Sequence, residues 1–538
     1  MNTIKGNIVD VVNKEIYKGE IFFTDVIEKI ERKNVEETQF ILPGFVNAHV
    51  HIESSMLSPF EFSKQVVKHG TVAIVTDPHE IANVLGIEGV NYMIENAKKG
   101  PVKVFFGAPS CVPSTTFESS GSVINSKDID ELLSRNEIFF LSEMMNFPGV
   151  IFGNKEVHAK LNAAKKYNKP VDGHAPGLSK IDIQKYISSG ISTDHECFNI
   201  QEAIDKISFG MKVQIREGSA AKNFEALFPL IESHPEMIML CTDDSHPDDL
   251  LKGHINLLAK RAFEKNLDYF NVLRTCSYNP IKHYNLPVGL LQKGDAADFI
   301  ICTDKYASNI SSVYINGKEK LTENYTQFSS LSPNNFKAAS ISEKDISFKN
   351  IGKFCNIISV IDGELITQKE KLNYSDVFNN DNSFKPGFNK IVVINRYEKN
   401  ATPVIGIVKN FNIKNGAIAS TIAHDSHNII SIGDSDFEIA KAINLVIESK
   451  GGISACNEIQ SELLPLEIAG IMTSKNVEWV AEKYKAISDF AKKELGTNLN
   501  APFMTMSFLA LLVIPELKIG DKGLFDIRTL EFVTLFEN

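Results

Sequence analysis

Between residues 41 and 284 the sequence alternates eight short apolar runs with stretches of helical periodicity, and this alternation constrains the fold more than any other feature. The apolar runs are FVNAHVHIE, TVAIVTD, VKVFFG, EIFFLSE, PVDGH, ISTDHE, MKVQIRE and MIMLCTDD. Helical patterns between them include SPFEFSKQVVKHG, NKEVHAKLNAAKKYN and LSKIDIQKYISSG. Eight strands that alternate with helices predict an α/β fold, a TIM-type (β/α)8 barrel. A doubly wound open sheet is the alternative, but no GxGxxG or Walker motif supports it.

The flanks of this block predict two further domains. Residues 1–40 carry short apolar runs separated by turns, and the same pattern returns in 285–334, so we expect one small β-sandwich domain built from both flanks. From residue 335 to 538 strand-like runs such as NKIVVINRY and IISIGD accompany a helical stretch that a glycine pair ends, DSDFEIAKAINLVIESKGG. We interpret 335–538 as a separate α+β domain.

Composition excludes several classes of protein. The net charge is −11, from 56 basic and 67 acidic residues, and no basic block occurs, so we expect no nucleic-acid partner. The seven cysteines include no CxxC pair, which argues against a disulfide framework or a zinc knuckle. The first residues lack the apolar core of a signal peptide, and the longest apolar run, 503–514, is too short to span a bilayer. We expect a cytoplasmic protein without a membrane partner.

Residues that bind metals stand at the ends of the predicted barrel strands. In a TIM barrel the catalytic groups lie where strands end and the following loops begin. His49 and His51 are alternate residues of the first strand, so both imidazoles point to one face. The second strand is followed by Asp77-Pro78-His79-Glu80, and the fourth, fifth and sixth end in Glu143, His174 and His195. The eighth ends in Asp243-Asp244. The full candidate set is His49, His51, Glu143, His174, His195 and Asp243.

This set predicts hydrolytic chemistry. Neutral imidazoles and carboxylates suit zinc, iron or manganese. Four histidines, a glutamate and an aspartate are enough for two ions, with Glu143 as the bridging ligand. A bound metal lowers the pKa of its water to about 7, which gives a nucleophile at neutral pH. Asp243 would then accept a proton and transfer it to the leaving group.

Several segments resemble the adenine deaminase family of the amidohydrolase superfamily. LPGFVNAHVHIESS is similar to the first-strand signature of the superfamily, and GLLQKGDAADFIICTD to its return into the β-domain. TDPHEIANVLG, GAPSCVPST, SEMMNFPGV, DGHAPGLS, STDHE, IREGSA and CTDDSHPDDL resemble adenine deaminases in particular. The resemblance extends over essentially the whole chain, including the C-terminal domain.

The resemblance implies hydrolysis of adenine to hypoxanthine and ammonia at a binuclear centre of manganese or iron, with zinc less favoured. The six candidate residues fall on the family's ligand positions, and Glu143 stands where many superfamily members carry a carboxylated lysine. Asp243 directly follows a threonine, which favours it over Asp244. A homo-oligomer is also implied.

Other polar residues at strand ends are candidates for proton transfer and substrate binding. Glu80, Glu217 and His79 are candidate acids for ring N1, and the catalytic set we predict is Asp243, Glu143 and Glu80. Arg216, Glu217 and Ser219 follow the seventh strand and offer donors and acceptors for a purine edge. A salt bridge from Arg216 to a neighbouring acid is the competing interpretation.

Two more clusters could bind a metal. Asp77 and His79 lie two residues apart after the second strand, and AHDSHN brings together His424, Asp425 and His427. A hydrogen-bonded turn is the alternative interpretation of AHDSHN, and a part in closing the active site is another.

Rival functions are open to test. Hydrolysis of a cyclic amide would call for a lysine on the fourth strand, which this chain lacks, and a non-catalytic barrel would be expected to lose its metal ligands. A zinc cytidine-deaminase site requires a PCxxC motif, and none occurs.

Overall fold

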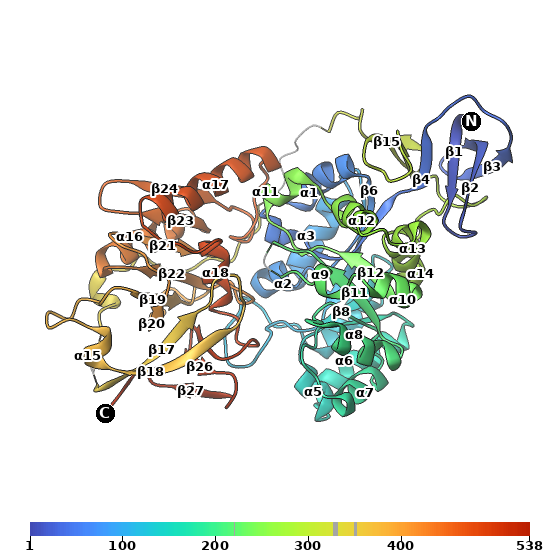
Figure 1. Cartoon of the computed structure of the whole chain (residues 1–538). Helices are drawn as coiled ribbons and strands as arrows, with labels where there is room; N and C mark the ends of the chain where they lie inside the picture. Colours follow the sequence, from blue (N-terminus) through green and yellow to red (C-terminus); the bar gives the residue numbers. More distant parts are fainter. Residues whose placement is uncertain (220, 326–331, 349–351) are drawn as a thin grey trace. The chain divides into compact units, whose positions relative to one another are not determined.

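The computed structural model describes residues 1–219, 221–325, 332–348 and 352–538. The chain forms two compact units (Figure 1). The first contains Met1–Pro78, Asn91–Ser110 and Asn125–Ser329, and the second contains His79–Val90, Cys111–Ile124 and Ser330–Asn538. Among the described residues, no helix combines the length and the apolar character needed to cross a membrane.

The first unit contains the predicted barrel. Its parallel strands follow one another in the order of the sequence, and β13 pairs with β5 to close the ring. An isolated parallel bridge between Val171 and Ile191 connects the two parts of the sheet. Each of the eight apolar runs contributes to this ring, which confirms the predicted fold class. The strands are β5 (Phe45–His51), β6 (Thr71–Thr76), β7 (Lys103–Pro109), β8 (Ile138–Met144), β9 (Val171–Gly173), β10 (Thr193–Asp194), β11 (Lys212–Arg216), β12 (Ile238–Cys241) and β13 (Asp243–Asp244).

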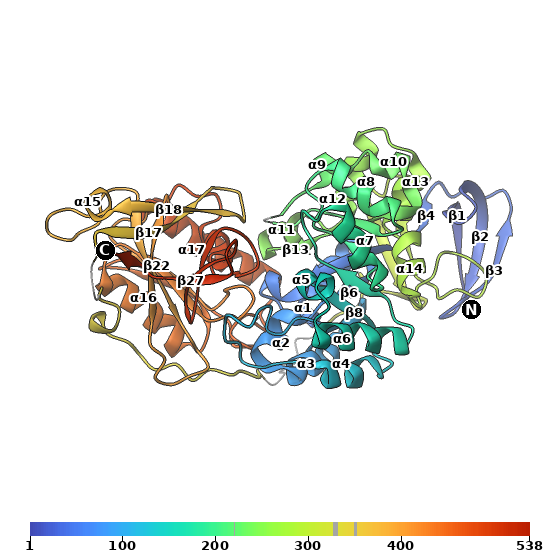
Figure 2. The ribbon, with the colours of Figure 1, turned by 90° about the horizontal axis from the view of Figure 1, so that it is seen from below.

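The barrel strands are buried because helices cover their outer faces, as Figures 1 and 2 show for the described chain. All residues of β5 and β6 are buried, which explains their continuous apolar character. Side-chain caps fix several helix starts; Ser58, for example, accepts a hydrogen bond from the backbone N–H of Glu61. The helices of this unit are α1 (Pro59–Val66), α4 (Ser126–Leu133), α5 (Phe147–Ile151), α6 (Lys155–Lys166), α7 (Lys180–Ser188), α8 (Ile200–Ser208), α9 (Phe224–Leu227), α10 (Leu230–Ser233), α11 (Pro247–Lys252), α12 (Ile255–Glu264), α13 (Tyr269–Thr275) and α14 (Tyr278–Tyr284). Helix α2 (His79–Leu85) belongs to the second unit, and α3 (Ile87–Ala97) begins there and ends in the first.

A small sheet beside the barrel takes strands from both flanks, as predicted. Seven of the described strands join in the order β16-β15-β14-β4-β1-β2-β3. Its core contains Ile8, Ile21, Phe23 and Phe299, and the rings of Phe23 and Phe299 meet edge to face at 5.2 Å. The strands are β1 (Asn2–Asp10), β2 (Glu15–Phe23), β3 (Ile27–Arg32), β4 (Phe40–Pro43), β14 (Phe299–Cys302), β15 (Ile310–Ile315) and β16 (Lys318–Glu319).

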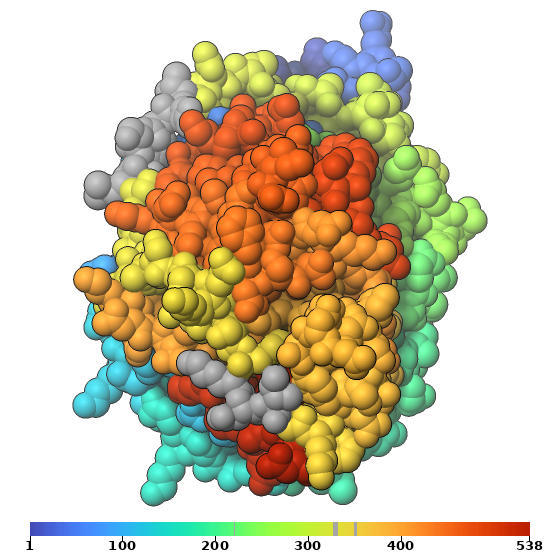
Figure 3. All heavy atoms as spheres, turned by 90° about the vertical axis from the view of Figure 1, so that its left-hand side faces the viewer, coloured from blue at the N-terminus to red at the C-terminus, as the bar shows by residue number. Residues whose placement is uncertain are grey.

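The second unit is built on a mixed sheet of nine of the described strands, with helix α16 packed against it. Figure 3 shows residues of this unit, coloured yellow to red, across much of the face turned to the viewer. The elements are β17 (Phe354–Val360), β18 (Thr367–Asn373), α15 (Tyr374–Val377), β19 (Phe388–Ile394), β20 (Val404–Lys409), β21 (Ala417–Ser420), β22 (Ile429–Gly433), α16 (Asp436–Glu448), β23 (Gly452–Cys456), β24 (Ser461–Pro465), α17 (Val477–Lys493), α18 (Pro502–Phe508), β25 (Leu517–Gly520), β26 (Gly523–Asp526), β27 (Glu531–Val533) and β28 (Phe536–Glu537).

Two segments that follow barrel strands belong to the second unit. Residues 79–90 come after β6, and residues 111–124 come after β7. Asn428 donates to the backbone carbonyl of Ser119 over 2.9 Å, and Asn335 donates to that of Val84 over 3.3 Å. The domain limits at 41–284 and 335–538 stay predictions.

Candidate metal centre

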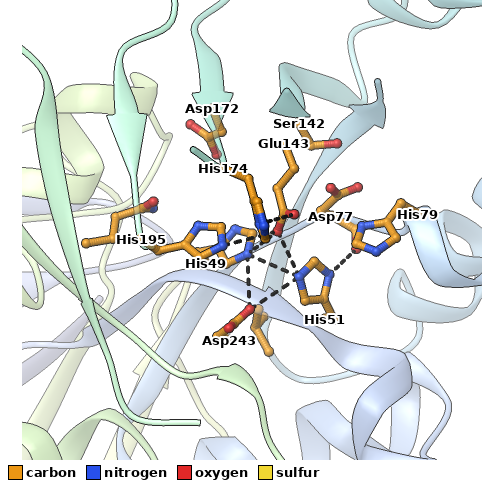
Figure 4. Close-up of polar contacts among 12 residues, drawn as sticks. His49, His51, Asp77, His79, Ser142, Glu143, Asp172, His174, His195 and Asp243 are labelled. Carbon is orange, nitrogen blue, oxygen red and sulfur yellow. Dashed lines mark hydrogen bonds and ion pairs between the residues drawn. The ribbon is translucent and has the colours of Figure 1, made fainter. Parts of the chain in front are cut away.

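The strand ends bring the predicted ligands together inside the barrel (Figure 4). His49 and His51 lie at the end of β5, and their Nε2 atoms are 2.7 and 2.9 Å from Oε1 of Glu143 on β8. His174 approaches the other carboxylate oxygen of Glu143 through Nδ1 at 3.4 Å. His195 approaches Oε1 through Nε2 at 3.7 Å. Glu143 therefore faces four imidazoles, and all five side chains are buried or nearly so.

Asp243 completes this group from the opposite side. Its Oδ1 lies 3.5 Å from Nε2 of His49 and 3.3 Å from Nε2 of His51. The backbone of Asp243 has a φ of 56°, which is uncommon for a residue other than glycine. Asp244 instead accepts a hydrogen bond from the hydroxyl of Ser54. The placement of Oδ1 supports the choice of Asp243.

The donor set fits a divalent cation. Nδ1 of His51 donates to the backbone carbonyl of Asp77 over 3.1 Å, so a neutral ring presents the lone pair of Nε2 to the cluster. Ligating histidines are commonly held in this way. Nδ1 of His49 and of His195 is buried without a hydrogen-bond partner among the described residues. Ligand atoms of His49, Glu143, His195 and Asp243 all lie within 4.8 Å of one another.

The electrostatics of the site favour positive charge. Burial lowers the pKa of His49, but hydrogen bonds with Asp243 and Glu143 outweigh it and raise that pKa to about 9. The same carboxylates that hold a proton on the ring would hold a metal ion in its place, and metal binding releases such protons.

An ion-pair network around Arg216 supports Asp243. Arg216 at the end of β11 donates through Nη1 to Oδ2 of Asp243 over 2.7 Å. It also pairs with both carboxylate oxygens of Glu196, to which Nη2 donates over 2.9 Å. Burial raises the pKa of Asp243, but the charge of Arg216 outweighs it and holds that pKa well below its usual range. The structure therefore confirms the salt-bridge interpretation of Arg216. A direct role of Arg216 in substrate binding stays a prediction.

We expect Arg216→Lys to lower kcat about 10- to 100-fold with little change in KM. The lysine ammonium cannot donate to Asp243 and Glu196 in the fixed planar geometry of the guanidinium. Steady-state ammonia release, with the metal content of each preparation measured, checks this. Arg274→Lys is the matched control, since Arg274 is buried in the same unit and pairs with Glu236 at 2.8 Å. A rise in KM alone would indicate a substrate contact and contradict the positioning role.

The other predicted purine ligands lie around a small cavity of about 170 Å³. Glu217 pairs with Arg261, and the hydroxyl of Ser219 donates to Asp249 over 2.7 Å. Thr242 and Ser245 also line this cavity. Both predicted residues therefore have protein partners, and their contact with substrate stays a prediction.

Glu80 lies in the second unit. Its Oε1 accepts a hydrogen bond from Nδ1 of His424 at 2.7 Å, and its Oε2 contacts Nε2 of His427. Burial raises the pKa of Glu80, but its pairing with these histidines, His424 foremost, outweighs burial and holds that pKa well below its usual range. The pairing favours a carboxylate, whereas the predicted role at ring N1 requires a proton donor. Sequence patterns could not show this pairing, because 344 residues separate Glu80 from His424.

Comparison with known proteins places the chain in a family. Residues 40–320 match the Amidohydrolase family, and residues 364–531 match the Adenine deaminase C-terminal domain. An adenine deaminase of Methanosarcina barkeri is 49% identical over 100% of both chains. One of Borreliella burgdorferi is 48% identical over 98% of this chain and 99% of its own. The crystal structure of an N-acetylglucosamine-6-phosphate deacetylase from Thermotoga maritima covers 60% of this chain and 99% of its own, at 13% identity and a TM-score of 0.45. The chain belongs to the adenine deaminase family of the amidohydrolases.

Proposed function

We propose that this chain hydrolyses adenine to hypoxanthine and ammonia. The buried cluster of four histidines, Glu143 and Asp243 carries the proposal, because it provides both a metal-binding donor set and an acid–base group. The full-length relatives that carry the name adenine deaminase support the choice of substrate.

The donor set accommodates two divalent ions, and we propose manganese or iron. One group of ligand atoms comes from His49, Glu143, His195 and Asp243, and a second comes from His174, His195 and Glu196. Glu143 offers one oxygen to His49 and His51 and the other to His174, as a bridging ligand would. When bound, such ions polarise water and lower its pKa to about 7, which supplies the nucleophile for attack on C6.

The residues of the chain control the proton and the surroundings. Asp243 accepts a proton through Oδ1 and transfers it to the departing amino group, while Arg216 holds Oδ2. Glu196 anchors Arg216 and thereby fixes the orientation of Asp243. Burial of these side chains excludes bulk water and strengthens their electrostatic interactions.

The test is ammonia release and the absorbance change when adenine is added to manganese-loaded protein, with adenosine and a cyclic amide in parallel. We expect turnover of adenine and not of adenosine. The absence of turnover in protein whose metal content is confirmed would contradict the proposal. Turnover of the cyclic amide instead would assign the rival reaction to the same centre.

A further inference from the structure

A further buried cluster of metal-binding side chains lies within the second unit. His79 and Glu80 begin α2, and Asp425 stands in the loop between β21 and β22. One ligand atom from each lies within 4.8 Å of the other two. Their exposed fractions are 4, 2 and 3%, so all three are withdrawn from water.

The chemistry of this cluster suits a first-row transition metal. One imidazole and two carboxylates are donors that manganese, iron and zinc accept. Metal–ligand bonds of about 2.0–2.2 Å place two donors of one ion at most about 4.4 Å apart, so little adjustment of these side chains is needed. Two buried carboxylates also repel each other, and a shared cation would offset that cost.

Glu80 is oriented by two further histidines of the same unit. The N–H of Ala423 donates to Nδ1 of His427 over 3.4 Å, so the neutral ring carries its proton on Nε2 and donates it to Glu80. Nδ1 of His424 is 2.7 Å from the other oxygen of Glu80. The ring of His424 stacks on Phe508, with centroids 4.6 Å apart. Carboxylates that bind metals are commonly hydrogen-bonded in this way.

We propose that His79, Glu80 and Asp425 of the second unit bind one divalent transition-metal ion, and that His424 and His427 orient Glu80 toward it. Glu80 cannot bind a metal and donate a proton to ring N1 at the same time, so this site replaces the acid role predicted from the sequence. The proposal does not depend on the reaction assigned to the barrel.

The direct test is anomalous X-ray diffraction at the manganese edge from crystals of the full chain loaded with manganese. We expect a peak within about 2.0–2.2 Å of ligand atoms from His79, Glu80 and Asp425, in addition to the peaks of the barrel centre. Fully occupied peaks at the barrel centre, with no anomalous peak bonded to His79, Glu80 and Asp425, would overturn the proposal. The anomalous peak does not depend on deamination, so a protein that failed to deaminate adenine would still test this metal site.

Metal counting in variants provides the second test. We expect Asp425→Asn to bind one manganese equivalent fewer per chain than the wild type. Asp434→Asn is the matched control, because Asp434 is exposed in the same unit and should leave the count unchanged. An unchanged count in Asp425→Asn overturns the proposal, and the diffraction experiment on the wild type decides the matter if that variant does not fold.

Discussion

Asp243→Asn should bind metal and yet lose turnover by about 10²- to 10⁴-fold, which is the range that general acid–base groups contribute. The amide keeps the shape of the side chain but cannot accept the proton that the carboxylate transfers. Oδ1 faces His49 and His51 at 3.5 and 3.3 Å, so the substitution acts at the centre of the cluster. Steady-state ammonia release from adenine, with metal content measured on the same samples, gives the result.

Asp244→Asn is the comparison that separates the two neighbouring aspartates. Asp244 accepts from the hydroxyl of Ser54, so we expect a much smaller loss of kcat than in Asp243→Asn. A larger loss in Asp244→Asn than in Asp243→Asn would exchange the two assignments.

Glu143→Gln should abolish activity by removing metal. Glu143 faces four imidazoles with its two oxygens, and an amide cannot bridge two cations with negative charge. We expect metal affinity to fall by more than the roughly 10- to 100-fold that changes in outer-shell partners cost. Equilibrium dialysis against manganese measures this directly.

Glu137→Gln is the control for that variant. Glu137 immediately precedes β8 and its side chain is half exposed, so the same substitution there should leave metal binding unchanged. Full manganese binding by Glu143→Gln would contradict the bridging role.

The sequence predicted the barrel well because the signals were local. Each strand was predicted from a run of apolar residues, and the ends of five of the eight runs supplied the six candidate ligands. His49 and His51, for example, follow from the alternation of a strand alone. The eight apolar runs and the geometry of parallel strands were sufficient for this part.

The sequence could not predict pairings that depend on side-chain contacts between distant residues. Glu196 directly follows His195, and this place at a strand end was a local signal for a site residue. Its ion pair with Arg216, however, depends on the packing of β10 beside β11. The contacts of Glu80 depend on a loop more than 340 residues away. No local periodicity reports contacts of that kind.

The division of the chain has a consequence for how such proteins can be shortened. The chain passes between the two units at 78/79, 90/91, 110/111, 124/125 and 329/330. Ile81 and Val84, which follow a barrel strand, are fully buried and belong to the second unit. A gene fragment that stops at residue 334 would keep residues 79–90 and 111–124 but remove most of the unit to which they belong. Recombination at one breakpoint cannot exchange or delete the C-terminal unit cleanly, and we expect the two units to have been inherited together.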